Sequence, residues 1–165
     1  MPYDYQKGLK FEKWAMEIYI AYLKSLGAEV EDLTGTKADY QHRGDLLVNG
    51  KLVQCKHRTE LYYRYHLRDN LIWVSIADDR VTKKGGAGTS TLRDNSDYWV
   101  TCYYLEENLV KVITIETAKF KPWIKENQHL YSKRSAGRGS GTVGLFVCLA
   151  DIPSEFCVIT NPPLS

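Results

Sequence analysis

The 165-residue chain lacks the features that define several large classes of protein. No apolar run approaches the ~20 residues needed to cross a membrane, and the first residues lack the apolar core of a secretory signal. The formal net charge is only +2. That value neither demands nor excludes nucleic acid as a partner, because the distribution of charge matters more than its sum. We therefore expect a cytoplasmic protein that makes no contact with a membrane.

Motifs for zinc, disulfides and ATP are also missing. The cysteines show no Cys-x-x-Cys spacing, which predicts buried thiols rather than zinc ligands or disulfides. No Gly-x₄-Gly-Lys-Ser/Thr pattern occurs, so this chain is not expected to use ATP. We find no internal repeat. A length of 165 residues suits one domain with a sizeable core, and we predict a single domain over residues 1–165.

Hydrophobic periodicity predicts an α/β or α+β domain with a central mixed β-sheet flanked by helices. A long helix is expected from Asp4 to Leu26, with Gly27 just after its end. Pro122 is expected to restrict a later helix to a start near that residue. Further strands are expected at residues 28–33, 71–77, 98–105, 109–115 and 143–149, and further helical segments at 58–68 and 117–127.

The most informative segment is a predicted β-hairpin over residues 44–57. Asn49-Gly50 is the strongest short-range signal for a two-residue type I′ turn, because both positions need a positive φ. A two-residue loop places Asp45 opposite Gln54, with their Cβ atoms about 5 Å apart on one face. Lys56 lies two residues further along and shares that face. The pattern therefore predicts that a carboxylate, an amide and an ammonium group converge.

The chemistry of this trio suits a divalent cation. Carboxylate and amide oxygens are hard ligands of the kind that Mg²⁺ prefers, and a nearby lysine can hold a water or a phosphate oxygen. The competing interpretation is a solvated hairpin end. Against it, both faces of the hairpin are apolar near the turn, which predicts burial on both sides, and buried polar groups need partners or a metal. The apolar residues are Leu47 and Leu52 on the polar face, and Leu46, Val48, Val53 and Cys55 on the other.

A glutamate on the first helix is a further candidate. Glu12 falls on the same apolar stripe as Ala15 and Tyr19, one turn before Ala15. An acid at the core-facing edge of an amphipathic helix is unusual. The alternative, which the pattern leaves open, is that Glu12 lies at the margin of the stripe and reaches water.

Basic residues around the hairpin predict contacts with nucleic-acid phosphates. Arg43 precedes Asp45, and His57 and Arg58 follow Lys56 directly. Beyond them, residues 58–68 interleave Arg and His with tyrosines, which can stack on unpaired bases or else pack on the core. Two glycine-rich segments, residues 80–95 and 132–142, either close over DNA or serve as plain connections. The first of these contributes Lys83 and Lys84 to the predicted binding residues.

Taken in order, these segments resemble the PD-(D/E)xK nuclease superfamily. The likeness is closest to Mrr-like restriction endonucleases, whose third motif often has the form Gln-x-Lys, and archaeal Holliday-junction resolvases share the layout. Each motif is short, but their order and spacing in a helix–strand–hairpin context are fairly specific. The likeness covers roughly residues 7–58. The segments that carry it are Lys7-Gly8-Leu9-Lys10-Phe11-Glu12, the helix up to Gly27, residues 29–32, Gly44-Asp45 and Val53-Gln54-Cys55-Lys56.

The resemblance implies a restriction-endonuclease-like core with a Mg²⁺ site, at which Mn²⁺ is expected to substitute. It implies roles for Glu12 as the helix acid, Asp45 as the central ligand, Gln54 as a ligand through its side-chain oxygen, the Cys55 carbonyl as a further ligand, and Lys56 as the catalytic lysine. Two departures matter. Gly44 stands where the family has proline, and Gln54 replaces the commoner acid, which removes one negative charge. Asp39 is a candidate to compensate for that charge.

We therefore expect a metal-dependent DNA endonuclease that hydrolyses phosphodiester bonds. Three alternatives stay open: a structure-specific junction resolvase of the same fold, a non-catalytic nucleic-acid-binding module, and a structural protein that binds a partner through its aromatic strands. Gln54 is the residue that permits the second alternative. A homodimer is expected from the resemblance alone, because cutting two strands needs two sites.

Overall fold

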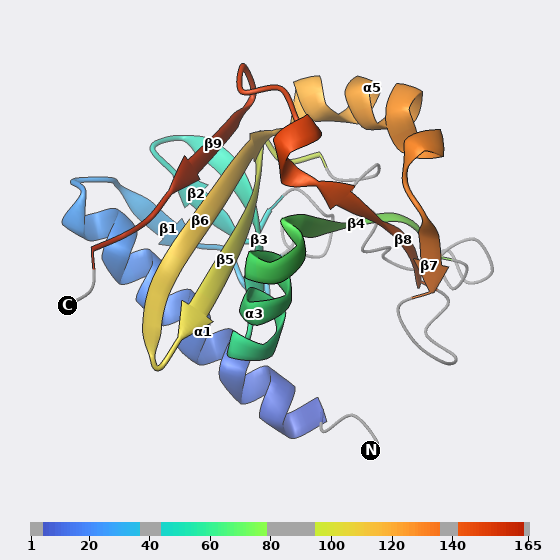
Figure 1. The fold of residues 1–165 in the computed structure, drawn as a ribbon. Helices are drawn as coiled ribbons and strands as arrows, with labels where there is room; N and C mark the ends of the chain where they lie inside the picture. The colour runs from blue at the N-terminus through green and yellow to red at the C-terminus, as the bar shows by residue number, and fades with distance from the viewer. Residues whose placement is uncertain (1–4, 37–43, 79–94, 136–141, 164–165) are drawn as a thin grey trace.

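The computed structural model describes residues 5–36, 44–78, 95–135 and 142–163 (Figure 1). It shows a mixed α/β fold with two sheets flanked by helices. The larger sheet has the strand order β1-β2-β3-β5-β6-β9, and the smaller one the order β4-β8-β7. Only β3 and β5 run parallel among these pairs of strands. The predicted central mixed sheet is therefore present, and a second, antiparallel sheet stands beside it.

The bounds of the larger sheet are β1 (Val30–Asp32), β2 (Leu46–Val48), β3 (Lys51–Arg58), β5 (Tyr98–Leu105), β6 (Asn108–Glu116) and β9 (Cys157–Thr160). The smaller sheet contains β4 (Leu71–Asp78), β7 (Lys133–Ser135) and β8 (Thr142–Cys148). The helices are α1 (Tyr5–Ser25), α3 (Glu60–Asp69), α5 (Thr117–Asn127) and the short 3₁₀ turns η2 (Gln128–Leu130) and η3 (Leu149–Asp151). None of the helices in the described residues is both long and apolar enough to cross a membrane.

The end of α1 follows from its sequence as predicted. Gly27 adopts φ +84°, in the left-handed region that glycine enters at little cost. Its N–H donates to the Lys24 carbonyl at 2.9 Å, and the Ala28 N–H donates to the Leu23 carbonyl at 3.1 Å. These are the two bonds of a Schellman motif, which satisfies carbonyls that the helix itself leaves unpaired. The chain can then turn directly into β1.

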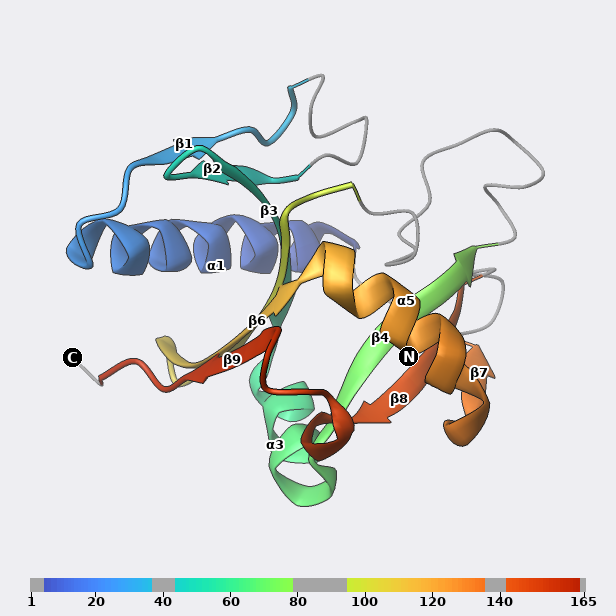
Figure 2. The ribbon, with the colours of Figure 1, turned by 90° about the horizontal axis from the view of Figure 1, so that it is seen from above.

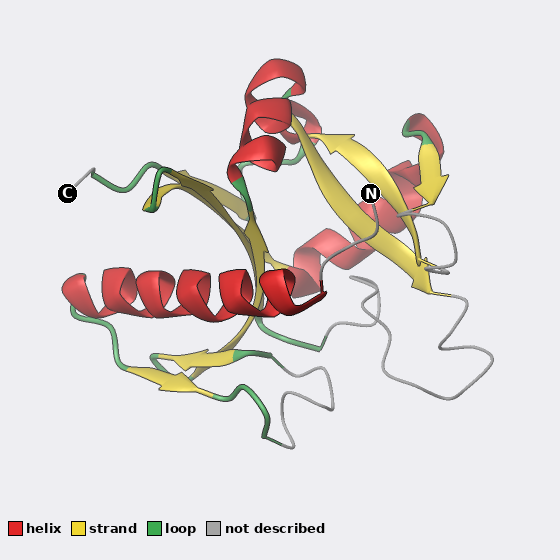
Figure 3. Cartoon of the chain, turned by 90° about the horizontal axis from the view of Figure 1, so that it is seen from below, coloured by secondary structure: helices red, strands yellow, loops and turns green. Residues whose placement is uncertain are grey.

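The larger sheet curls around α1, as Figures 2 and 3 show. The helix contacts β1, β3 and β6, and its buried residues Ala15 and Tyr19 join a core formed with Val53, Cys55 and Val100. The opposite face of the sheet carries Trp99, Tyr103, Ile113 and Ile115, which pack against α5 and the smaller sheet in a second core. The large sheet is therefore buried on both faces, with one core on each side.

The structure corrects two predictions about elements and contains two strands that were not predicted. The first strand covers only residues 30–32 rather than 28–33. The helix spans Thr117–Asn127 as predicted, but the expected restriction to a start near Pro122 is wrong, because the proline lies within it. Burial of Phe120 and Ile124 on its inner face holds that helix in place despite the missing N–H. The short strands β7 and β9 were not predicted, because neither is long enough to show a clear alternation of apolar and polar residues.

Candidate functional site

The predicted hairpin forms in the predicted register. Asn49 and Gly50 adopt φ +48° and +80°, as a type I′ turn requires. Leu46 pairs with Val53, and Leu47 with Leu52. Exposure alternates along β3, where Val53, Cys55 and His57 are buried while Gln54, Lys56 and Arg58 are half-buried. The assignment of residues to faces is therefore confirmed, although the polar face is only partly shielded from solvent.

Asp45 and Gln54 meet just beyond the last paired residues of the hairpin. Regular pairing ends at Leu46 and Val53, and Asp45 lies in a bend. Its backbone N–H donates to the Val53 carbonyl at 2.8 Å. Its carboxylate oxygen Oδ2 accepts hydrogen bonds from Gln54 Nε2 at 2.9 Å and from the Cys55 N–H at 2.8 Å. The side chains that the sequence placed opposite each other are thus in direct contact.

The bond to Cys55 has a structural purpose. The Cys55 N–H points toward β2, but β2 has no paired residue left at that position. The Asp45 carboxylate therefore supplies the acceptor that a longer strand would have provided. Because the N–H and C=O of one strand residue point to the same edge, the Cys55 carbonyl faces the same edge as Asp45. A carboxylate, an amide and a carbonyl consequently gather at the end of the hairpin.

Gly44 is required at this point by the close approach of two backbones. It adopts φ +144°, and a Cβ atom added there would lie 3.0 to 3.2 Å from the backbone N, C and O of Val53. A side chain would push the bend away from β3, and with it the Asp45 carboxylate. The glycine that stands where the resembled family has proline therefore has a local steric cause.

Glu12, Asp45 and Lys56 all act electrostatically on one buried residue, Cys55. Burial raises the pKa of the Cys55 thiol, Cys102 adds to the effect, Asp45 and Glu12 raise it further, and Lys56 lowers it. Glu12, Asp45 and Lys56 therefore lie close enough to Cys55 to affect its pKa, and Gln54 is connected to them through its hydrogen bond to Asp45. Arg58 lies near them too, because it also acts on Glu12.

Glu12 is at the margin of the apolar stripe rather than within it. Its side chain is exposed, yet protein atoms crowd its carboxyl group enough for burial to raise its pKa, while Lys56 and Arg58 lower it. The exposure shows that this carboxyl group still reaches solvent. A carboxylate at the rim of the site, attracted by two cations, remains available to an ion or a substrate.

His57 does not have the position that we predicted for a phosphate-binding residue. It is 6% exposed and packs against Tyr19 of α1. Tyr104 donates its hydroxyl hydrogen to the Ala15 carbonyl at 2.8 Å, so the 2.8 Å bond between His57 Nδ1 and that hydroxyl must be donated by Nδ1–H. Burial lowers the pKa of His57 to about 4, and Lys56 and Arg58 act in the same direction. His57 is therefore a neutral histidine of the core, and the prediction that it contacts DNA phosphates is wrong.

The donor set fits a hard cation with few charged ligands. Within the part of the chain that the structure describes, no three His, Cys, Asp or Glu side chains are arranged to hold a metal. A site built around Asp45 would use the Gln54 amide and the Cys55 carbonyl beside it, with Glu12 at the rim. Oxygen ligands of this kind suit Mg²⁺. In the structure, the amide nitrogen of Gln54 donates to Asp45. If the amide rotated so that its oxygen faced Asp45 instead, the Gln54 oxygen and the Asp45 carboxylate would need a cation between them.

Some predicted residues fall outside the described part of the chain. Arg43, Lys83, Lys84 and Asp39 belong to this group. Sequence patterns did not identify Trp73, Arg134 and Phe146 as candidates. These residues line a pocket together with Arg58. Trp73 and Phe146 alternate with buried neighbours along β4 and β8, which indicates that their side chains lie on the outer face of the smaller sheet. Their neighbours in sequence do not indicate which other residues lie near that face.

Comparisons of the chain with models of protein families, with curated proteins and with solved structures find no match.

Proposed function

We propose that the chain is a metal-dependent DNA endonuclease with a restriction-endonuclease-like core. The observation that carries the proposal is the contact between Asp45 and Gln54, with Lys56 one pleat further along the same face of β3. Glu12 and Arg58 supply one acid and one further cation in the same neighbourhood. The bond to the Cys55 N–H accounts for the Asp45 carboxylate, but it does not account for Glu12, Lys56 and Arg58 nearby.

The residues divide the work of phosphodiester hydrolysis. Asp45, Gln54 and the Cys55 carbonyl would hold Mg²⁺, which when bound polarises the phosphate and lowers the pKa of a coordinated water. Lys56 neutralises developing charge or orients the attacking water, and Arg58 holds a neighbouring phosphate. Preorganised charges of this kind supply about 3 to 4 kcal/mol each to the stabilisation of a transition state.

The direct test is cleavage of supercoiled plasmid DNA in Mg²⁺, Mn²⁺ or EDTA. Asp45→Asn keeps an oxygen acceptor for the Cys55 N–H, so the fold should persist while cleavage falls by about 10²- to 10³-fold. Lys56→Ala should lose a similar factor. Lys51→Ala is the matched control, because Lys51 is an exposed lysine at the other end of β3. Undiminished cleavage by Asp45→Asn or Lys56→Ala would rule out the assigned roles.

A variant of Gln54 tests the metal site without measuring activity. Gln54→Glu places two carboxylates in contact, so it should melt at a lower temperature than the natural chain in EDTA. Adding Mn²⁺ or Mg²⁺ should reverse this, because a ligand at 100 times its Kd stabilises the folded state by about 2.7 kcal/mol. Asp45→Asn should abolish the metal-dependent rise in either background.

One observation favours a second candidate, a non-catalytic nucleic-acid-binding module. The Asp45 carboxylate already accepts hydrogen bonds from Gln54 and Cys55, so this edge of the sheet is satisfied by protein donors. The binding module would be favoured over the enzyme by two results together. The melting temperatures of the natural chain and of Gln54→Glu would not change when metal is added, and the natural chain would bind DNA tightly.

A further inference from the structure

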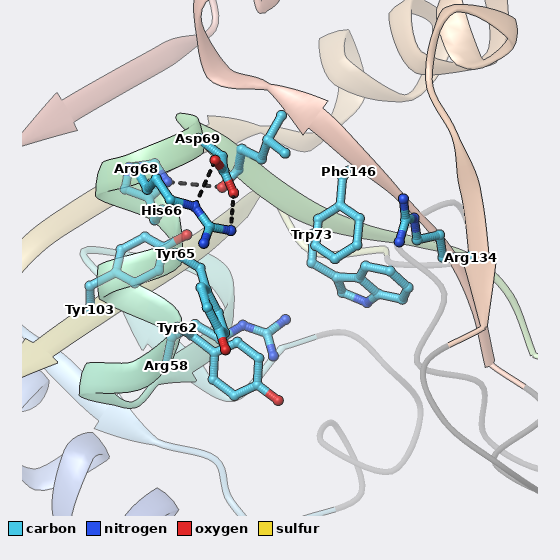
Figure 4. A pocket seen from close by; sticks show the side chains of 11 residues that line it. Arg58, Tyr62, Tyr65, His66, Arg68, Asp69, Trp73, Tyr103, Arg134 and Phe146 are labelled. Carbon is cyan, nitrogen blue, oxygen red and sulfur yellow. Dashed lines mark hydrogen bonds and ion pairs between the residues drawn. The ribbon is translucent and has the colours of Figure 1, made fainter.

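A pocket of about 600 Å³ opens beside the candidate site, and cationic and aromatic side chains line it. Its walls come from distant parts of the chain. Figure 4 shows Tyr62, Tyr65 and Arg58 on one side and Trp73, Phe146 and Arg134 on the other. The first group belongs to α3 and the end of β3, and the second to the smaller sheet. Exposed aromatic rings therefore occur on both walls.

The wall formed by the smaller sheet is shaped to present two rings. Trp73 and Phe146 face each other edge-on, with centroids 5.1 Å apart, and Phe146 is 39% exposed. The indole lies against Gly144 on the neighbouring strand, where an added Cβ atom would fall 2.4 Å from the ring. The Arg134 guanidinium lies 5.9 Å from the centre of the Phe146 ring. A glycine, two rings and a cation thus form one surface.

The opposite wall repeats this chemistry. Tyr62 and Tyr65, about half exposed, lie with centroids 6.5 Å apart on α3. The Arg58 guanidinium is 5.8 Å from the Tyr62 ring centre. Arg68, beside Tyr65, forms two hydrogen bonds with Asp69, which neutralises much of its charge. Arg58 and Arg134 therefore contribute most of the positive charge, one on each wall.

We propose that this pocket binds unpaired nucleotides of a DNA strand. Bases without a pairing partner expose flat faces that stack on aromatic rings, and their phosphates are attracted to guanidinium groups. A duplex hides those faces within its own stack, so it could not stack its bases on the four rings that line this pocket. Two rings and a guanidinium on each wall can bind both the bases and the phosphates of a single strand.

The position of the pocket gives this binding a consequence for the substrate, and this step rests on the proposed function. Arg58 lines the pocket and lies two residues from Lys56 on the same face of β3, which is about 7 Å at 3.3 Å per residue. A strand held in the pocket therefore leads to the candidate catalytic lysine. The preferred substrate is DNA with an unpaired segment next to the scissile phosphate, such as a fork or a flap.

The binding test uses the full chain in EDTA, so that it is independent of cleavage. Fluorescence anisotropy would compare a labelled thymidine oligonucleotide, a blunt duplex and an RNA strand of equal length. We expect the single DNA strand to bind most tightly and to quench tryptophan emission. Phe146→Ala should weaken its binding about tenfold, and Trp73→Phe should remove most of the quenching while preserving the fold.

Charge substitutions separate the pocket from general attraction to phosphate. Arg58→Gln and Arg134→Gln should each reduce the slope of log K against log salt by about 0.7, the value for one phosphate contact with a single strand. Arg64→Gln is the matched control, because Arg64 is an exposed arginine of α3 that pairs with Glu60 outside the pocket. It should bind like the natural chain.

The outcomes distinguish this proposal from the proposed function. Loss of cleavage in Asp45→Asn with intact binding of single strands supports the pocket, as does strand binding by a chain that cleaves nothing. Equal affinity of Phe146→Ala and the natural chain for the single strand would overturn the pocket even if plasmid cleavage is confirmed. Tighter binding of the RNA strand, or preference for the blunt duplex, would overturn the assignment to unpaired DNA.

Discussion

At the scale of single residues, buried backbone groups form hydrogen bonds with side chains from other elements. Asp45 accepts the Cys55 N–H at the end of β2, and Tyr104 accepts from His57 while donating to the Ala15 carbonyl. A variant at such a position changes stability and chemistry together. This is why Asp45→Asn is a better test than Asp45→Ala, which would leave a buried donor unpaired at a cost of about 1 to 3 kcal/mol.

A pH dependence of stability is predicted for His66. This 3% exposed residue donates from Nδ1 to the Leu71 carbonyl and accepts from Lys111 at Nε2, so it is neutral in the fold. Burial lowers its pKa, the bond to Leu71 raises it and Lys111 lowers it, with a net decrease. The unfolded chain therefore binds the proton more readily. The contribution to stability is complete above the unfolded pKa of about 6.5 and decreases as pH falls below it.

Urea unfolding at pH 7.5 and pH 5 checks this prediction. The natural chain should lose more unfolding free energy between the two pH values than His66→Gln, which keeps an N–H donor but does not titrate. His57 acts in the same direction in both proteins, so it cancels from the comparison. Equal losses in the two proteins would contradict the role of His66.

At the scale of elements, the hairpin is the part most sensitive to backbone geometry. It contains two glycines with positive φ, Gly44 and Gly50, but only Gly44 lies against another backbone. The turn at Gly50 has open space around the position of a Cβ atom. The two positions therefore separate backbone strain from steric contact.

Gly44→Ala should destabilise the protein by about 1 to 3 kcal/mol through backbone strain, with an added cost for displacing Val53. Gly50→Ala should lower the unfolding free energy by about 1 kcal/mol, because the alanine must adopt a left-handed conformation but contacts no other atoms there. Denaturant midpoints of the two variants give the comparison. A cost for Gly50→Ala equal to or greater than that for Gly44→Ala would show that the contact with Val53 is not limiting.

At the scale of the whole molecule, one core connects both sheets. Phe120 of α5 is fully buried, stacks on Trp99 of the larger sheet and on Trp123, and shares its core with Ile72 and Leu145 of the smaller sheet. The two sheets and α5 therefore share one apolar core. A molecule connected in this way should unfold in one cooperative transition.

Phe120→Ala should lower the unfolding free energy by about 3 to 5 kcal/mol, as is usual when a large buried ring is removed. Circular dichroism and tryptophan fluorescence should still give coincident transitions. Leu130→Ala, at a 63% exposed position after the same helix, should change stability by less than about 0.5 kcal/mol. Separate transitions in the natural chain would show that the two sheets unfold independently.

Sequence patterns predicted the features that depend on neighbouring residues. The Asn49-Gly50 turn determines the register of the hairpin, and the register brings Asp45 to Gln54, so this contact needed no information from elsewhere. The pairing of the smaller sheet was not predicted, because it joins Leu71 to Cys148, nearly half the chain apart. The pocket depends on that pairing, and for the same reason Trp73 and Phe146 were not recognised as neighbours of Arg58.

The carboxylate of Asp45 has consequences for how this protein can change over time. The same carboxylate that accepts the Cys55 N–H at the end of β2 is the one that the proposed chemistry needs. A lineage that abandoned cleavage would still be selected to retain an acceptor there, with asparagine as the nearest replacement. Persistence of an aspartate at this position is therefore weak evidence of an active enzyme, whereas an ordinary apolar residue there would require the hairpin itself to be rebuilt.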